Sequence, residues 1–276
     1  MATSSGIALI AKRRGSLNGS GIVGAILTGT ITTAMGGYGR AALLVGFFAG
    51  SSLLSSRRRP AEAKRKALEA SSKRVDSTPE RVAARGAKRD IWQVLANGGV
   101  STLLAAMGDS RSHCFAYTGS LAAVNGDTWA TEIGSRLSSQ PRHILTFQPA
   151  QPGVSGAISL PGTLASVAGG SFIGALAVVT SSFDSAFRGI AARHLLTGLV
   201  AGAIGSLADS LIGATMQERR WCDRCQESTE NVRHTCGDPT RIVGGVPGLN
   251  NDVVNVLCSV SGAMVGVLIE RSSRRY

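Results

Sequence analysis

Residues 194–216 read HLLTGLVAGAIGSLADSLIGATM, and residues 154–179 read VSGAISLPGTLASVAGGSFIGALAVV. Each stretch is long enough for a helix across a bilayer, which needs about 20 predominantly apolar residues. Both are filled with Gly, Ala, Ser and Thr, and small residues allow transmembrane helices to approach closely. These two stretches therefore predict membrane-spanning helices.

Five further apolar stretches accompany them, although several are short enough to be core helices of a soluble protein. The first two are separated only by residues 36–40, which predicts a tight hairpin. We expect an all-α, polytopic transmembrane helical bundle with about six to eight membrane segments, in which residues 1–276 form one integral membrane domain. The five stretches are 21–35, 41–54, 91–107, 113–124 and 253–269.

Composition and charge placement support a membrane partner over a nucleic acid. Hydrophobic residues make up 43 % of the chain and charged residues only 17 %, and 35 glycines are present, which is unusual for a soluble domain. The net charge of +12 is concentrated, because twelve Lys/Arg and only four Asp/Glu lie between Ser56 and Arg89. A basic segment between apolar ones is typical of a cytoplasmic loop, here 56–90. We expect contact with the lipid bilayer and no nucleic-acid partner.

The ends of the chain bear on its topology. Lys12 and its neighbours precede an apolar run without a convincing cleavage site, so we expect an uncleaved first span. With the 56–90 loop in the cytoplasm, seven spans would place Arg271, Arg274 and Arg275 outside. The positive-inside rule then indicates that one apolar stretch is re-entrant or miscounted.

Four carboxylates border or interrupt the apolar stretches: Asp127, Glu132, Asp209 and Asp252. Ionisable residues inside spans are costly and are functional candidates by default. Counting spans from the basic loop brings all four to the cytoplasmic side. We predict one catalytic site, in which Asp127, Asp209 and Asp252 hold Mg²⁺ against a phosphate.

Local sequence leaves alternatives open for three of these carboxylates. Asp127 and Glu132 would not share one face of a continuous helix, so we expect a turn or helix break at Gly126. The two could instead be solvated loop residues, and Asp252 could be only a helix N-cap.

Amides and a glycine-containing loop are candidates for binding substrate phosphate. The loop 147–157 leads into a helix, and a helix N-terminus with free N–H groups suits an anion. It lacks the Gly-Lys-Ser/Thr of a Walker A motif, so an ordinary entry turn remains the alternative. The candidates are Asn97, Asn125, Gly153, Ser155, Gly156, Asn251 and Asn255.

The polar insert 218–248 contains the pattern Cys222-x2-Cys225 followed by His234-x-Cys236. Thiolates and imidazole at this density suit tetrahedral Zn²⁺, and a reducing cytoplasm leaves thiols free to bind it. Four protein ligands would close the coordination sphere, so we expect a structural metal. A disulfide or no metal are the alternatives.

Four ordered motifs, at 125–134, 151–159, 205–217 and 249–255, together with residues 93–100, carry a family resemblance over nearly the whole chain. The chain resembles the integral membrane family of transmembrane-protein-19-like proteins and phytyl-phosphate kinases. The Cys/His insert is similar to that of bacterial members, which implies the plasma membrane of a prokaryote.

The resemblance implies a Mg-dependent phosphotransferase that uses a nucleoside triphosphate to convert a polyprenyl or phytyl monophosphate to the diphosphate. The alternatives are a membrane carrier or transporter, which would distribute polar residues through the bilayer depth, and a non-enzymatic membrane scaffold. The residues that align with family motifs are Asp127, Glu132, Asp209, Asn251, Asp252 and Asn255.

Overall fold

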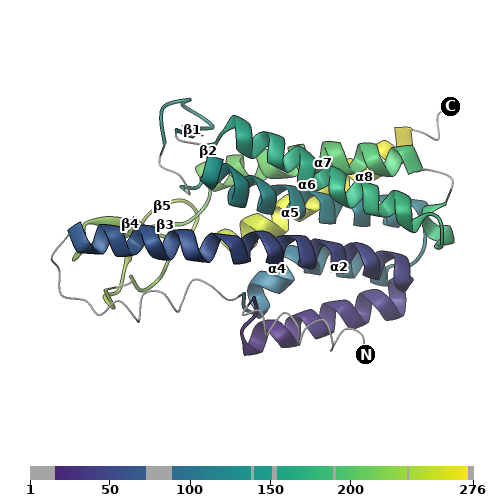
Figure 1. Ribbon diagram of the computed structural model, residues 1–276, viewed down its shortest axis with the longest axis horizontal. Helices are drawn as coiled ribbons and strands as arrows, with labels where there is room; N and C mark the ends of the chain where they lie inside the picture. The colour runs from purple at the N-terminus through teal and green to yellow at the C-terminus, as the bar shows by residue number, and fades with distance from the viewer. Residues whose placement is uncertain are drawn as a thin grey trace.

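A bundle of long helices dominates the computed structural model, which describes residues 16–72, 89–137, 140–150, 154–188, 191–234 and 236–272, with the backbone alone at 55–72 (Figure 1). The six α-helices are α2 (Gly19–Ser72), α4 (Ile91–Ala106), α5 (Arg111–Leu137), α6 (Leu160–Thr180), α7 (Ala191–Thr215) and α8 (Asn251–Ser272). A 3-10 turn, η1 (Ser185–Phe187), follows α6. The short strands are β1 (Arg142–His143), β2 (Ala157–Ile158), β3 (Arg219–Cys222), β4 (Glu227–Thr229) and β5 (Arg241–Gly244).

The first helix, α2, reverses direction at Gly37. This residue has φ 77°, a left-handed conformation that glycine adopts without a Cβ clash. The first half of α2 packs on α4, where Gly24 lies against Val94, and the second half packs on α6, where Gly46 lies against Leu176. The predicted hairpin is therefore present, and counting its two halves separately gives seven helical segments among the described residues.

The central helix of the bundle is α5, which packs against α2, α4, α6, α7 and α8. Every residue from Cys114 to Gly126 is buried. Its polar side chains bond neighbouring helices: Ser120 lies 2.7 Å from Ser259 of α8, and the Asn125 amide donates to Gly169 O of α6 at 2.7 Å. Polar side chains on a helix that is buried on all sides depend on neighbouring helices for their hydrogen-bond partners.

The outer surface of the bundle is apolar. Helices α6, α7 and α8 are each long and apolar enough to cross a membrane. They expose large apolar side chains, among them Leu164, Leu199 and Met264. An extended exposed apolar surface marks a contact with lipid or another protein. Together with the helix count, this confirms the predicted polytopic all-α membrane bundle.

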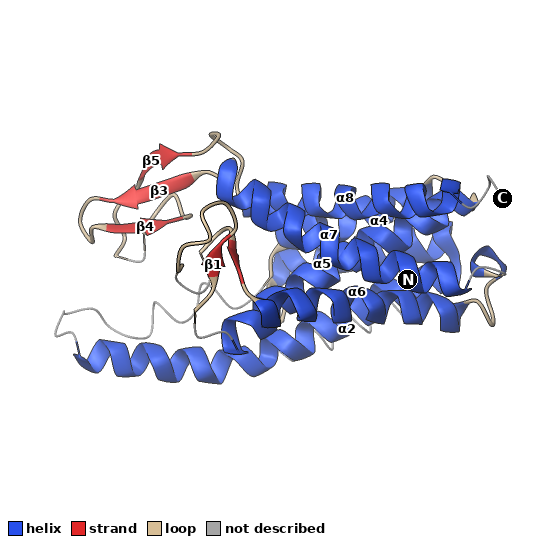
Figure 2. Ribbon diagram, turned by 90° about the horizontal axis from the view of Figure 1, so that it is seen from above, coloured by secondary structure: helices blue, strands red, loops and turns tan. Residues whose placement is uncertain are grey.

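All five strands lie at one end of the bundle (Figure 2). β1 and β2 pair antiparallel between α5 and α6, and the order β4-β3-β5 forms an antiparallel sheet between α7 and α8. The second half of α2 extends past the bundle at the same end (Figure 1). The first part of the basic segment 56–90 was predicted as a loop but is helical, since α2 continues to Ser72. Arg, Lys, Glu, Ala and Leu, which are frequent there, are strong helix formers. Residues 73–88 lie outside the described part.

Candidate functional site

A cavity of about 270 Å³ lies at the strand-bearing end of the bundle, between α5, α6 and α7. Two of the predicted carboxylates, Asp127 of α5 and Asp209 of α7, line it. The segment around β2 and the first residue of α8 close its other sides. The convergence of Asp127 and Asp209 from distant parts of the sequence makes this cavity the candidate site.

Asp127 follows Gly126, at which α5 packs closely on both α6 and α7. A Cβ on the preceding residue, Gly126, would lie 2.8 Å from the carbonyl oxygens of both Gly202 and Ser166, so only glycine allows this approach. The helix is continuous here, and the predicted turn or break at Gly126 is wrong. Gly126 serves packing between helices, and it fixes Asp127 at the edge of the cavity.

Asp127 and Asp209 both line the cavity and interact electrostatically. Ser206 donates from Oγ to Oδ1 of Asp127 at 3.4 Å. The Oδ2 atom of Asp209 is buried and has no hydrogen-bond partner among the described residues. A buried carboxylate oxygen without a partner is costly, so this atom is available for a cation or a donor group.

The opposite wall is the entry to α6. Gly156, with φ 82°, holds this segment against α7, and a Cβ there would lie 2.5 Å from Cβ of Ala214. Ser159 caps α6 by accepting from Gly162 N at 3.2 Å. Pro161 has no N–H, so the first turn of α6 lacks a full set of free N–H groups for binding an anion. It offers instead the helix dipole and the hydroxyls of Ser159 and Thr163.

The lining is acidic and rich in hydroxyl groups. Among the residues that the structure describes, no Lys or Arg lines the cavity. The two basic residues nearest in sequence are engaged elsewhere: Arg136 donates to Leu54 O at 2.7 Å and Arg142 to Phe147 O at 2.7 Å. Carboxylate and hydroxyl oxygens without a positive side chain suit a hard cation such as Mg²⁺.

The other two predicted carboxylates lie outside the cavity lining. Glu132 is about 140° around α5 from Asp127, at 100° per residue, and it lies 3.6 Å from Arg136. Asp252 is half-buried and interacts electrostatically with Asp90, at the start of α4. The cap of α8 is Asn250, whose Oδ1 accepts from Val253 N at 3.1 Å, so Asp252 is not the N-cap.

The phosphate-binding candidates are also divided. Ser155, Gly156 and Asn251 line the cavity. Asn97 donates to Gln93 O within α4, Asn125 bonds α6, and Asn255 lies farther along α8. Gly153 lies outside the described residues.

Several lining residues were not expected from the sequence. Most are hydroxyl residues of the three helices, and their helical spacing with Asp127 and Asp209 could have identified them. Glu230 of the Cys/His insert had no local signal, because only the tertiary fold brings the insert to the cavity. The lining residues missed are Thr131, Ser135, Ser159, Thr163, Ser166, Ser206, Ser210 and Glu230.

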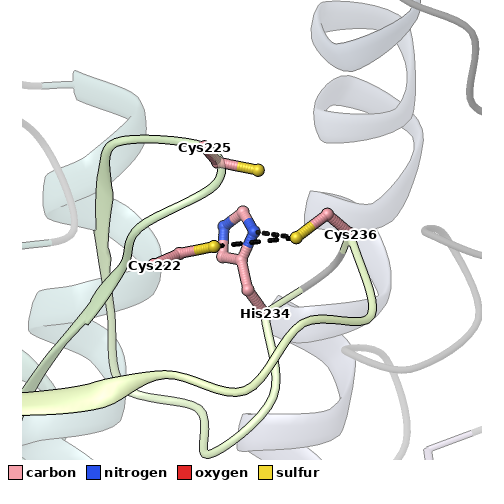
Figure 3. A group of neighbouring side chains, drawn as sticks. All are labelled: Cys222, Cys225, His234 and Cys236. Atoms are coloured by element: carbon pink, nitrogen blue, oxygen red, sulfur yellow. Dashed lines mark hydrogen bonds between the residues drawn. The ribbon is translucent and has the colours of Figure 1, made fainter.

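The Cys/His insert brings its four candidate ligands together (Figure 3). One ligand atom from each of Cys222, Cys225, His234 and Cys236 lies within 4.8 Å of all the others. The first two flank the turn between β3 and β4, in which Gln226 N donates to Cys222 O at 2.9 Å. Sulfur and imidazole ligands in this arrangement could hold a soft or borderline metal ion.

Local hydrogen bonds favour a thiolate at Cys236 and not at Cys225, because the contact with Cys236 raises the pKa of the Cys225 thiol to about 12. The backbone N–H of Asp238 and the side chain of His234 lower the pKa of the Cys236 thiol to about 7. The Nδ1 atom of His234 lies 3.3 Å from Cys236 Sγ, and its Nε2 lies 3.7 Å from Oε2 of Glu227. A carboxylate on the far ring nitrogen orients a histidine ligand, as in many metal sites.

Comparison with known proteins agrees with the architecture. A family model described as "Integral membrane protein DUF92" matches residues 2–263. The chain is 31 % identical to Protein PGR of Arabidopsis thaliana, over 91 % of this chain and 88 % of that protein. It is 30 % identical to an uncharacterized membrane protein of Methanocaldococcus jannaschii, over 95 % of this chain and 90 % of that protein.

A more distant relative is Protein VTE6, chloroplastic, of Arabidopsis thaliana, which is 26 % identical over 92 % of this chain and 66 % of that protein. No solved structure matches the chain. The family match covers most of the sequence, which confirms the resemblance found from its motifs. The chain belongs to the integral membrane protein DUF92 family.

Proposed function

We propose that this protein is a membrane-bound phosphotransferase that converts an isoprenoid monophosphate, polyprenyl or phytyl, to the diphosphate with a nucleoside triphosphate and Mg²⁺. The observation that carries the proposal is the convergence of Asp127 and Asp209 on a cavity whose other wall is the N-terminus of α6. The motif resemblance to phytyl-phosphate kinases supports the substrate class.

The chemistry requires little from the protein beyond position and charge. A phosphate oxygen of the acceptor bonds to the γ-phosphorus of the donor, and the bond to the nucleoside diphosphate breaks. Phosphoryl transfer of this kind depends on alignment and on neutralising charge. Mg²⁺ held by Asp127 and Asp209 would supply that neutralisation. The α6 dipole and the hydroxyl of Ser159 would bind phosphate oxygens.

Two polar pairs in the depth of the bundle join packed helices, and this structural role favours an enzyme over a carrier. Thr118 lies 3.1 Å from Nδ1 of His194 of α7, and Ser120 lies 2.7 Å from Ser259 of α8. These are contacts between packed helices, which stabilise membrane bundles. The cavity, by contrast, is confined to one end of the bundle.

The test is transfer of labelled phosphate from ATP or CTP to phytyl and geranylgeranyl monophosphate by the purified full-length protein in detergent. We expect Mg-dependent formation of the diphosphate, lost on addition of EDTA and restored by Mg²⁺. Folded, monodisperse protein that forms no product with either donor would contradict the proposal and would direct the work to transport assays.

We assign Zn²⁺ to the Cys/His cluster, as a structural ion. With Zn–S bonds of about 2.3 Å, two sulfurs of a tetrahedral site lie about 3.8 Å apart. Cys222 Sγ and Cys236 Sγ are 3.6 Å apart. Three thiolates and one imidazole would fill the coordination sphere, which leaves no open position for catalysis.

Elemental analysis tests this assignment. We expect about one zinc ion per chain, and loss of that zinc in Cys225→Ser. Cys258→Ser is the matched control, because Cys258 is buried in α8, away from the cluster, and its replacement should leave zinc content unchanged. Wild-type protein expressed with zinc but purified without it would contradict the assignment.

We place the cavity on the cytoplasmic side of a prokaryotic plasma membrane. The basic residues that follow α2's membrane segment belong to the same end of the bundle as the cavity (Figure 2), and basic segments near spans are retained in the cytoplasm. Nucleoside triphosphates are available on that side. Arg271, at the end of α8, then lies on the opposite side, as seven segments require, so this topology departs from the positive-inside rule at the C-terminal end instead of containing the expected re-entrant or miscounted stretch.

A further inference from the structure

One carboxylate of the cavity comes from outside the helices. Glu230 follows β4 in the Cys/His insert, lines the cavity beside Asp209, and interacts with it electrostatically. Oε1 of Glu230 accepts a hydrogen bond from Ser155 Oγ at 3.0 Å, so it also contacts the wall that leads into α6. Its side chain is exposed, which places it at the mouth of the cavity.

The backbone on both sides of Glu230 is fixed. Before it, β4 pairs with β3 through Thr229 and Arg220. After it, Thr240 donates from Oγ1 to Asn231 O at 2.6 Å, and its backbone N–H donates to Val232 O at 3.0 Å. Two flanking sets of hydrogen bonds restrict where the Glu230 side chain can reach.

The Cys/His cluster holds the loop that contains Glu230. Cys225 precedes Glu230 and His234 follows it, so both arms of the loop end at the same cluster. The base of the insert is held separately. Glu218 accepts from Gly248 N at 2.6 Å, and this hydrogen bond, with that from Arg220, lowers the pKa of Glu218.

The charge of the cavity favours a bound cation. Asp127, Asp209 and Glu230 bring three carboxylates to one cavity, and no Lys or Arg of the described chain lines it. Like charges that interact while partly removed from water repel each other unless protons or a cation neutralise them, and a divalent cation can bind to all three oxygen donors. The helices alone supply two carboxylates, and the insert adds the third.

We propose that Glu230 is a third carboxylate of the divalent-cation site and that the metal-bound Cys/His cluster positions it there. This rests on the proposed function, in which Asp127 and Asp209 bind the cation. The insert is then a part of the site, because the ion held by its thiolates sets the geometry of a carboxylate at the cavity mouth.

The test is the affinity for Mn²⁺, a hard cation that accepts the same oxygen ligands as Mg²⁺, measured by electron paramagnetic resonance on the zinc-loaded full-length protein in detergent. We expect Glu230→Gln to bind Mn²⁺ about 10- to 100-fold more weakly. Asp223→Asn is the matched control. It removes a carboxylate from the same insert, but Asp223 pairs with Arg241 on the surface, so affinity should stay within about twofold.

A double-mutant cycle tests the positioning role. Cys236→Ser should lose zinc and weaken Mn²⁺ binding by a similar factor, and adding Glu230→Gln to it should cause little further loss, because both changes remove the same contact. Wild-type Mn²⁺ affinity in Cys236→Ser without zinc would overturn that role.

Asp209→Asn separates failure of this inference from failure of the proposed function. If Asp209→Asn weakens Mn²⁺ binding and Glu230→Gln does not, Glu230 is outside the site and the phosphotransferase proposal stands. If neither variant changes the affinity, the cation site of the proposed function is itself wrong.

Discussion

Asp209→Asn is expected to lower the rate of phosphate transfer about 100- to 1,000-fold, the usual cost of removing one charge-stabilising group from a catalytic site. Asparagine keeps the shape of the side chain and removes its negative charge. The Oδ2 atom of Asp209 has no hydrogen-bond partner among the described residues, so the native fold does not depend on a contact that this atom makes. The measurement is kcat with saturating donor, acceptor and Mg²⁺.

The same substitution should not destabilise the protein. Asp127 and Asp209 repel each other when no cation is bound. Removing one charge should therefore leave the Tm of the metal-free protein unchanged or raise it, while activity falls. Opposite effects on activity and stability are typical of functional residues held at a cost to the fold.

The control for this prediction is Asp238→Asn, a carboxylate of the insert that pairs on the surface with Arg224 at 3.6 Å. Its activity should equal that of the wild type, because exposed ion pairs contribute little. Near-normal turnover by Asp209→Asn would exclude a cation-binding role for this carboxylate. A large fall in Tm would show instead that Asp209 is structural.

The sequence was sufficient to predict that Asp127 and Asp209 lie at the same end of the bundle. Span lengths and the basic segment after the hairpin placed Asp127 and Asp209 on one side, and the two do line the same cavity. Both results depend on quantities that sequence encodes directly, namely the length of apolar runs and the placement of charge.

The sequence was not sufficient to predict which side of each helix faces the cavity. Glu132 was expected to join Asp127 through a break at Gly126, but α5 is continuous there, and five residues of a continuous helix correspond to about 140°. The apolar pattern gave no guide, since α5 is buried on all sides along the stretch that ends at Gly126. A helix that is buried on all sides lacks the separate apolar and polar faces from which its orientation could be predicted.

The position of Glu230 could not be predicted for a different reason. The insert follows α7, and β4 returns antiparallel to β3, so that Glu230 meets Ser155 only in the tertiary structure. The ligand spacing predicted the metal cluster itself, since the ligands lie close together along the chain. By contrast, no spacing pattern in the sequence indicates that a carboxylate of the insert contacts a segment far away along the chain.

Gly126→Ala is expected to destabilise the protein by about 1–3 kcal/mol and to abolish most activity. In a helix, replacing glycine by alanine is normally favourable by up to about 1 kcal/mol. Here the added methyl would lie 2.8 Å from two carbonyl oxygens, those of Gly202 and Ser166, which belong to rigid helix backbone. The helices must separate, and Asp127, the next residue, moves with α5. The measurements are Tm in detergent and kcat.

Gly99→Ala in α4 is the matched control, because a Cβ built on Gly99 meets nothing within 4 Å. It should be neutral or slightly stabilising, so of the two substitutions, identical in chemistry, only Gly126→Ala should lower Tm. Equal Tm shifts would mean that α5, α6 and α7 are not in close contact at Gly126. A normal Tm with lost activity would show that the helices accommodate the methyl group. It would also show that a displacement of Asp127 too small to affect packing is enough to stop catalysis.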